Sequence, residues 1–215
     1  MLLVRGQKAR LADIATGPRF DAGLSYSHGG PGRLETCLLG LDQGMRLSDH
    51  RFLLHEPGRS TPDSAVRFLG PHGGDLAGFQ VDLAALSPHV ARLAFVAFID
   101  GPGALNQLEH GRFRITEGGS ERARLVFSGS DFSYEKAIIV AQLYLLGQEW
   151  RLSSDLQGFK EGIEAVFAHS GGQALFRQLT APQPLGPPAP PGEAQEAREG
   201  PGHGPVPPPG GRVLH

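Results

Sequence analysis

The sequence predicts a mainly β fold, a sandwich or a barrel of short strands accompanied by two short helices. Three observations predict it. Several short runs alternate apolar and polar residues with a period of two, as half-buried strands do. The run Leu93–Ile99 is apolar on both faces, which suits a central strand covered on both sides. Glycine-rich turns separate the runs, and short strands with such turns between them are typical of a sandwich or a barrel.

Six segments are predicted to be strands, three of them from strict alternation. In chain order they are residues 34–41, 65–69, 79–83, 93–99, 112–116 and 122–127. Glycine turns precede or separate them at Gly29–Gly32, Gly73–Asp75, Gly101–Gly103 and Gly118–Gly119.

Two segments are predicted to be helices. Ser133 is a plausible N-cap for a helix over residues 134–146, and Gly147 is placed to end it. Apolar residues recur in this segment at helical spacing and form a wide stripe. A shorter amphipathic pattern over residues 160–168 predicts the second helix.

Proline marks the end of the chain. Residues 181–215 hold 11 of the 18 prolines and few large apolar side chains, so this segment cannot bury enough surface to offset its ordering entropy. We therefore assign residues 1–175 to one folded domain and residues 176–215 to a disordered Pro/Gly-rich tail. A solvated tail is the simpler interpretation, although proline-rich segments also bind aromatic grooves.

Composition excludes several classes of protein. The formal net charge of −2 argues against a nucleic-acid binder driven by electrostatics. The longest apolar run has seven residues, far short of the roughly 20 that a membrane-spanning helix needs. No signal peptide is evident, and the single cysteine cannot form an internal disulfide. We expect a soluble cytoplasmic protein.

Catalytic and metal-binding motifs are scarce. The sequence has no G-x-S-x-G elbow, P-loop, H-E-x-x-H or EF-hand loop, and its histidines show no ligand spacing. Cys37 lies in an apolar run, where a buried core residue is the better interpretation than a nucleophile. The glycine-rich segment Gly70–Asp75 is interpreted as a turn rather than a phosphate loop.

The order of local patterns resembles that of the TerD-like tellurium-resistance and stress proteins. The resemblance covers roughly residues 2–170, and no single motif carries it. The matching segments, in chain order, are L-V-R-G-Q-K at 3–8, G-L-S-Y at 23–26, Q-V-D-L at 80–83, L-S-P-H-V at 86–90, L-A-F-V-A-F-I at 93–99, S-D-F-S at 130–133, E-W-R at 149–151 and Q-G-F-K-E-G at 157–162. The resemblance implies a β-sandwich of two sheets with short flanking helices. It also implies acidic loops that bind calcium, and work within membrane-associated assemblies of several proteins.

The chain departs from the family where calcium would bind. The family's D-L-D-A-S motif stands as Arg33–Cys37, and its long acidic loop is shortened to Gly70–Gly78. Glu35 and Asp75 are the only plausible remnants of the ligand set. Calcium needs six to eight oxygen ligands, so two carboxylates with an adjacent arginine are a poor site. We expect no metal site and no cofactor, with tight calcium binding lost.

Three hypotheses about function follow. The first is a non-enzymatic, TerD-like stress-response protein that acts as a protein-interaction scaffold, with partners that include other tellurium-resistance proteins but no nucleic acid and no direct insertion into a membrane. The second is a calcium-binding member that uses reduced acidic loops. The third is an enzyme with an unrecognised active site, since fold alone does not determine function.

Overall fold

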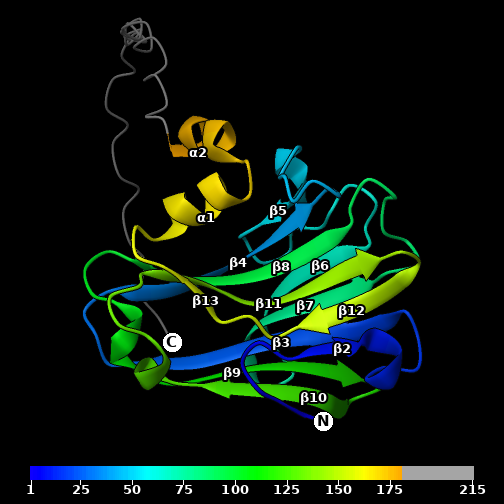
Figure 1. Ribbon diagram of the computed structural model, residues 1–215, viewed down its shortest axis with the longest axis horizontal. Coiled ribbons are helices and arrows are strands. Elements are labelled where there is room, and N and C mark those ends of the chain that lie inside the picture. The colour runs from blue at the N-terminus through cyan, green and yellow to red at the C-terminus, as the bar shows by residue number, and fades with distance from the viewer. Residues whose placement is uncertain (181–215) are drawn as a thin grey trace, which may run out of the picture. The chain divides into compact units, whose positions relative to one another are not determined.

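The computed structural model describes residues 1–180, which form two β-sheets packed face to face, with two helices on the outer side of one sheet (Figure 1). We call them sheet A, with the strand order β1-β10-β9-β3-β7-β6, and sheet B, with the order β2-β12-β11-β8-β4-β5 and β13 added beside β11. Neighbouring strands are antiparallel except for β1 and β10. The sandwich of two sheets with short flanking helices is therefore confirmed.

The elements have the following bounds. Sheet A consists of β1 (Leu2–Leu3), β3 (Arg19–His28), β6 (Val66–His72), β7 (Asp75–Asp82), β9 (Leu108–Glu117) and β10 (Ser120–Phe127). Sheet B consists of β2 (Lys8–Arg10), β4 (Arg33–Leu41), β5 (Leu53–Leu54), β8 (Arg92–Asp100), β11 (Ala137–Leu146), β12 (Glu149–Ser153) and β13 (Gln157–Phe159). The helices are α1 (Ile163–His169) and α2 (Gln173–Thr180).

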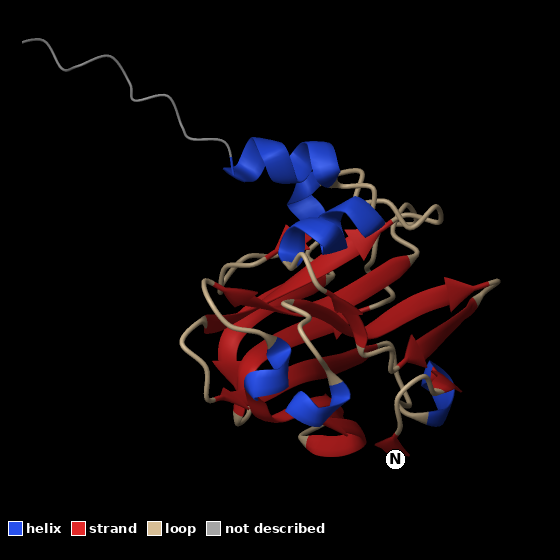
Figure 2. Ribbon diagram, turned by 60° about the vertical axis from the view of Figure 1, so that its left-hand side comes forward, coloured by secondary structure: helices blue, strands red, loops and turns tan. Residues whose placement is uncertain are grey.

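Sheet B is buried on both faces over much of its area. On β8, Leu93 and Phe95 point into the main core between the sheets, whereas Ala94 and Val96 belong to a second apolar cluster. Val166 and Phe167 of α1 complete that second cluster, and the two helices lie together on this side of the strands (Figure 2). Strand β8 is thus the doubly covered central strand that its sequence predicts.

The helix predicted over residues 134–146 is wrong, because residues 137–146 form strand β11. The prediction failed because β11, like β8, is buried on both of its faces. Ile138 and Val140 face the main core, while Ala137 and Ile139 lie under the helices. A strand that is apolar on both faces has no period of two, and short apolar runs of this kind cannot be told from a buried helix by periodicity alone.

The remaining predictions are borne out unevenly. All six predicted strands are present, and the predicted helix at 160–168 is α1. The sequence did not predict helix α2 or strands β1, β2, β3, β5, β12 and β13. Helix α2 extends the described fold to Thr180, past the domain boundary expected at residue 175. The expected disorder of residues 181–215 lies outside the described residues. Within residues 1–180, no helix is both long enough and apolar enough to cross a membrane.

Candidate functional site

A tight hairpin joins β6 to β7 and places Asp75 at the start of β7. His72 pairs with Asp75 across a two-residue loop, Gly73-Gly74, whose φ angles are 60° and 86°. Positive φ at both loop positions is the signature of a type I′ turn, which glycine adopts at no steric cost. The glycine-rich segment is therefore a hairpin turn, as interpreted from the sequence.

The Asp75 carboxylate lies over the outer face of sheet A, above a glycine. In the register of the sheet, Gly23 of β3 pairs with Gly78 of β7 on one side and with Arg114 of β9 on the other. A Cβ atom on Gly23 would overlap the Asp75 carboxylate. Gly23 and Gly78 thus leave a gap between the side chains on this face of the sheet. The Asp75 carboxylate fills the gap above Gly23.

Three side chains, one from β3 and two from β9, hold this carboxylate. Ser25 donates from its hydroxyl to Oδ1 at 2.7 Å, Arg112 donates from Nη2 to Oδ1 at 2.8 Å, and Arg114 donates from Nε to Oδ2 at 2.7 Å. Arg114 also donates from Nη2 to the carbonyl of Gly73, which fastens the hairpin turn to β9. We call Asp75, Ser25, Arg112 and Arg114 the Asp75 cluster.

The cluster is mostly shielded from water. The Asp75 side chain is 5% exposed, that of Arg114 is 16% exposed and that of Arg112 is 33% exposed. Burial on its own raises the pKa of Asp75, but the hydrogen bonds from Ser25, Arg114 and Arg112 outweigh burial and place the pKa below its ordinary value. Asp75 is therefore ionised at neutral pH, with two guanidinium groups as its counter-ions.

Glu35, the other candidate ligand, lies on the opposite outer face of the sandwich. It pairs with Phe98 in the register of sheet B, and Phe98 packs against the apolar cluster under the helices. Its carboxylate forms an ion pair with Arg33. Both sheets separate Glu35 from Asp75, and packed sheets stand about 10 Å apart. The two residues therefore do not share a site.

The other residues singled out from the sequence have structural surroundings. Tyr26, the last residue of the G-L-S-Y segment, donates from its hydroxyl to the carbonyl of Leu34 at 2.9 Å and so links the two sheets. Cys37 is 2% exposed, and burial raises the pKa of its thiol to about 12. Across residues 1–180, no three histidine, cysteine or acidic side chains gather closely enough to hold a metal ion.

Sequence reasoning identified Asp75 but missed the two arginines that hold it. Arg112 and Arg114 lie 37 and 39 residues further along the chain, on a strand that does not pair with β7. Their alternation with buried Phe113 was a signal that they face outward on one side of β9. The order of the strands, which sets Asp75 beside them, could not be read from that pattern.

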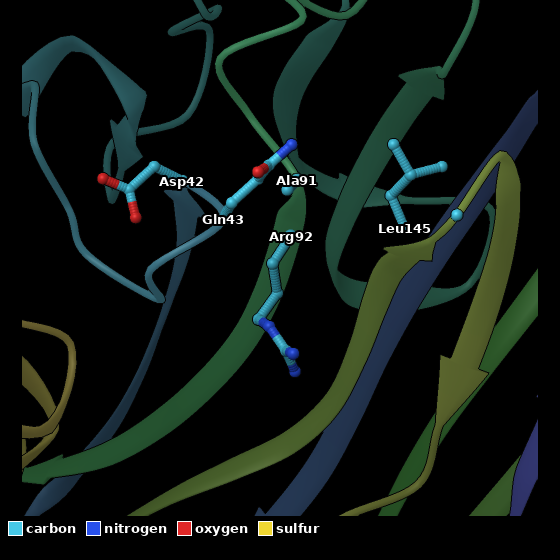
Figure 3. Close-up of a pocket in the computed structure, with 6 residues that line it drawn as sticks. Asp42, Gln43, Ala91, Arg92 and Leu145 are labelled. Carbon is cyan, nitrogen blue, oxygen red and sulfur yellow. The ribbon is translucent and has the colours of Figure 1, made fainter.

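A second polar feature lies in sheet B, where a cavity of about 340 Å³ opens beside Arg92 (Figure 3). Asp42, Gln43, Ala91, Leu145 and Gly147 complete its lining. Asp42 accepts a hydrogen bond from the backbone N–H of Arg46 at 2.9 Å, and in Figure 3 its carboxylate points away from the Arg92 guanidinium. No ion pair joins these two residues among those that the structure describes.

A second cavity, of about 500 Å³, is lined by a serine, a histidine and an aspartate that form no hydrogen-bonded chain with one another. Ser87, His89 and Asp63 all line it. The Asp63 carboxylate accepts from the backbone N–H groups of Ser87 and Ala65 and from the hydroxyl of Thr61. No hydrogen bond of His89 is found within the described part of the chain, so a nucleophile–base–orienter arrangement is not assembled.

Comparisons with known proteins agree with this fold. The TerD domain matches residues 1–169. The tellurium resistance protein TerA of Alcaligenes sp. is 29% identical over 128 residues, which are 59% of this chain and 35% of TerA. The chemical-damaging agent resistance protein B of Clostridium acetobutylicum is 27% identical over 96 residues, 42% of this chain and 69% of that protein. The chain thus spans about a third of the length of TerA.

A solved structure has the same fold. It is the crystal structure of a homologue of the telluride resistance protein TerD from Streptomyces coelicolor A3(2), with a TM-score of 0.52 and 19% identity. The match covers 70% of this chain and 95% of that one.

Proposed function

The chain belongs to the TerD family, and on that premise we propose that it is a cytoplasmic, non-enzymatic protein of the tellurium-resistance type that acts as an interaction scaffold without bound calcium. The observation that carries the proposal is the Asp75 cluster. The segment Gly70–Gly78 stands where the resemblance to the family implies an acidic calcium loop, and its one acid is held by two arginines.

The positive charges of the two arginines explain why the Asp75 cluster does not need a calcium ion. Calcium is coordinated by several oxygens at once, and these oxygens must not already be bound to other cations. Both oxygens of Asp75 accept hydrogen bonds from arginine, and a calcium ion would have to displace guanidinium groups that already supply two positive charges. The Arg112 and Arg114 side chains therefore neutralise the Asp75 carboxylate, as a bound divalent cation would.

The same reasoning applies at Glu35. The arginine that replaces the first aspartate of the family's motif, Arg33, is the residue that binds Glu35. Each candidate ligand is thus paired with arginine, on its own face of the sandwich. This supports the loss of calcium binding at both positions.

Within residues 1–180 no catalytic group is assembled at the sites described above, and this supports a non-enzymatic role. In the second cavity the Asp63 carboxylate binds backbone N–H groups instead of orienting His89. Cys37 is buried with a raised thiol pKa, which makes it a poor nucleophile. We expect the protein to act by binding protein partners, including other tellurium-resistance proteins in a membrane-associated assembly.

One experiment tests both halves of the proposal. The tagged full-length protein is expressed in tellurite-stressed cells, cross-linked, and its partners are identified by mass spectrometry in excess calcium and in excess chelator. We expect the same enriched partners in both conditions. Recovery of no partner would contradict the scaffold role, and a partner set that depends on calcium would contradict the loss of the ion.

A further inference from the structure

A row of long side chains crosses four strands on the outer face of sheet B. The register pairs Arg92 of β8 with Tyr144 of β11, Tyr144 with Arg151 of β12, and Arg151 with Arg10 of β2. Residues paired in this way point to the same side of a sheet. Leu143, the neighbour of Tyr144, points into the main core, so the row faces outward. We call these four residues the arginine row.

Arg92 is a half-buried cation without a carboxylate partner in residues 1–180. Its guanidinium lies 5.1 Å from the centre of the Tyr144 ring and donates from Nη1 to the side-chain oxygen of Gln142 at 3.0 Å. Gln142 is oriented in turn by Asp155, which accepts from its amide nitrogen. These contacts fix the position of the charge without neutralising it, and a partly buried, unpaired charge lowers the stability of the free protein.

Arg151 also has unused donors. Its Nε is buried without a hydrogen-bond partner, and its ion pair with Glu149, 3.4 Å away, is shared, because the same carboxylate lies 3.9 Å from the Nε of Arg10. Arg10 differs, because both oxygens of Asp13 accept from its guanidinium. Arg92 and Arg151, on either side of Tyr144, are therefore the two cations of the row with capacity for a further anion.

The surroundings of Arg92 leave room for such a group. The cavity of about 340 Å³ lies beside it, and the one acid in the lining, Asp42, is turned away (Figure 3). At the end of β11, Leu146 is 58% exposed. Arginine and tyrosine next to exposed apolar surface are the residue types enriched at the centres of protein interfaces.

We propose that the arginine row binds an acidic, extended segment of a protein partner, with one carboxylate beside Arg92 in the cavity and another on Arg151. Charge complementarity selects the partner, since the guanidinium groups of Arg92 and Arg151 stand on alternate strands, about 10 Å apart. About three residues of extended chain span that distance, so the segment carries acids three positions apart or in a continuous run. This inference rests on the proposed scaffold function and names the surface that performs it.

The test uses a fluorescein-labelled hexaglutamate peptide and the full-length protein, with binding measured by fluorescence anisotropy at low salt. We expect the wild-type protein to bind the peptide. Arg92→Met and Arg151→Met should each weaken binding roughly tenfold or more, as expected when a desolvated charge pair loses one member. Arg67→Met is the matched control, because it removes the same charge from an exposed position on sheet A. It should leave binding unchanged.

Thermal unfolding separates a binding role from a structural one. Methionine keeps the apolar stem of Arg92 and removes its unpaired charge, so the melting temperature of Arg92→Met should equal or exceed that of the wild type. Failure of the peptide to bind, equal weakening by Arg67→Met, or a lower melting temperature for Arg92→Met would each overturn the proposal. So would displacement of the peptide by inorganic phosphate beyond that by chloride of equal ionic strength, which would indicate a small-anion site. If cross-linked partners persist while the peptide fails to bind, the arginine row is refuted and the scaffold function stands.

Discussion

Replacement of Asp75 by asparagine tests whether the Asp75 cluster holds the outer face of sheet A together. The substitution keeps the size of the side chain and removes its charge. Arg112 then loses its carboxylate partner, and Arg114 keeps only the more distant Glu121, whose carboxylate lies 3.8 Å from its Nη1. Breaking an ion pair at a partly buried site in this way is strongly destabilising.

The magnitude follows from the exposure of the three side chains. Breaking a fully buried pair costs about 3–5 kcal/mol. Arg112 is 33% exposed and can be rehydrated, and Arg114 keeps its bond to the Gly73 carbonyl, so the lower end of that range applies. We expect Asp75→Asn to lower the free energy of unfolding by about 3 kcal/mol. For a domain of this size that loss lowers the melting temperature by roughly 6–12 °C.

The assay is denaturant unfolding followed by circular dichroism, with Asp82→Asn as the control. Asp82 lies on the same strand and pairs with Arg19, whose side chain is 81% exposed, so losing that surface pair should cost less than about 1 kcal/mol. Asparagine can still accept the backbone N–H of Ala84. If the two variants lose the same stability, the reasoning about the Asp75 cluster is refuted.

Three further predictions follow from the same contacts. Because folding depresses the pKa of Asp75, its contribution is complete above its ordinary value of 3.8 and is lost as the pH falls through the lower folded value. Acid titration of stability should therefore fall more steeply for wild type than for Asp75→Asn below pH 3.8, and parallel curves would contradict this. Cys37 should not react with an aromatic disulfide reagent at pH 8 in the folded protein and should react fully in denaturant, because its thiol is buried with a pKa of about 12; rapid labelling of the native state would be inconsistent with that burial. Gly23→Ala should be strongly destabilising in wild type and much less so together with Asp75→Gly, since the three atoms nearest to its Cβ all belong to the Asp75 side chain; additive losses in the double variant would rule out that clash.

Strand β3 could have been predicted from the sequence. Phe20, Ala22 and Leu24 are buried and alternate with more polar residues, so its period of two was present and simply not recognised. Strand β11 lacked such a period, because the helices cover its second face. Its run of β-branched residues, Ile138 to Val140, was the remaining sign of a strand.

The candidate site was predictable only in part. The resemblance directed attention to Asp75, and the arginine at position 33 correctly suggested positive charge beside Glu35. The arginines of β9 reach Asp75 because β3, which lies between β7 and β9, carries the small residues Gly23 and Ser25 at this point. Such a contact depends on strand order, which a single sequence does not specify.

Calorimetric titration of the full-length protein with calcium at pH 7 and low ionic strength tests the central claim most directly. With Asp75 bound to two arginines and Glu35 to a third, the account predicts no saturable heat up to millimolar calcium. A dissociation constant below the millimolar range, lost in Asp75→Asn, would show that calcium displaces the arginines and would contradict the account.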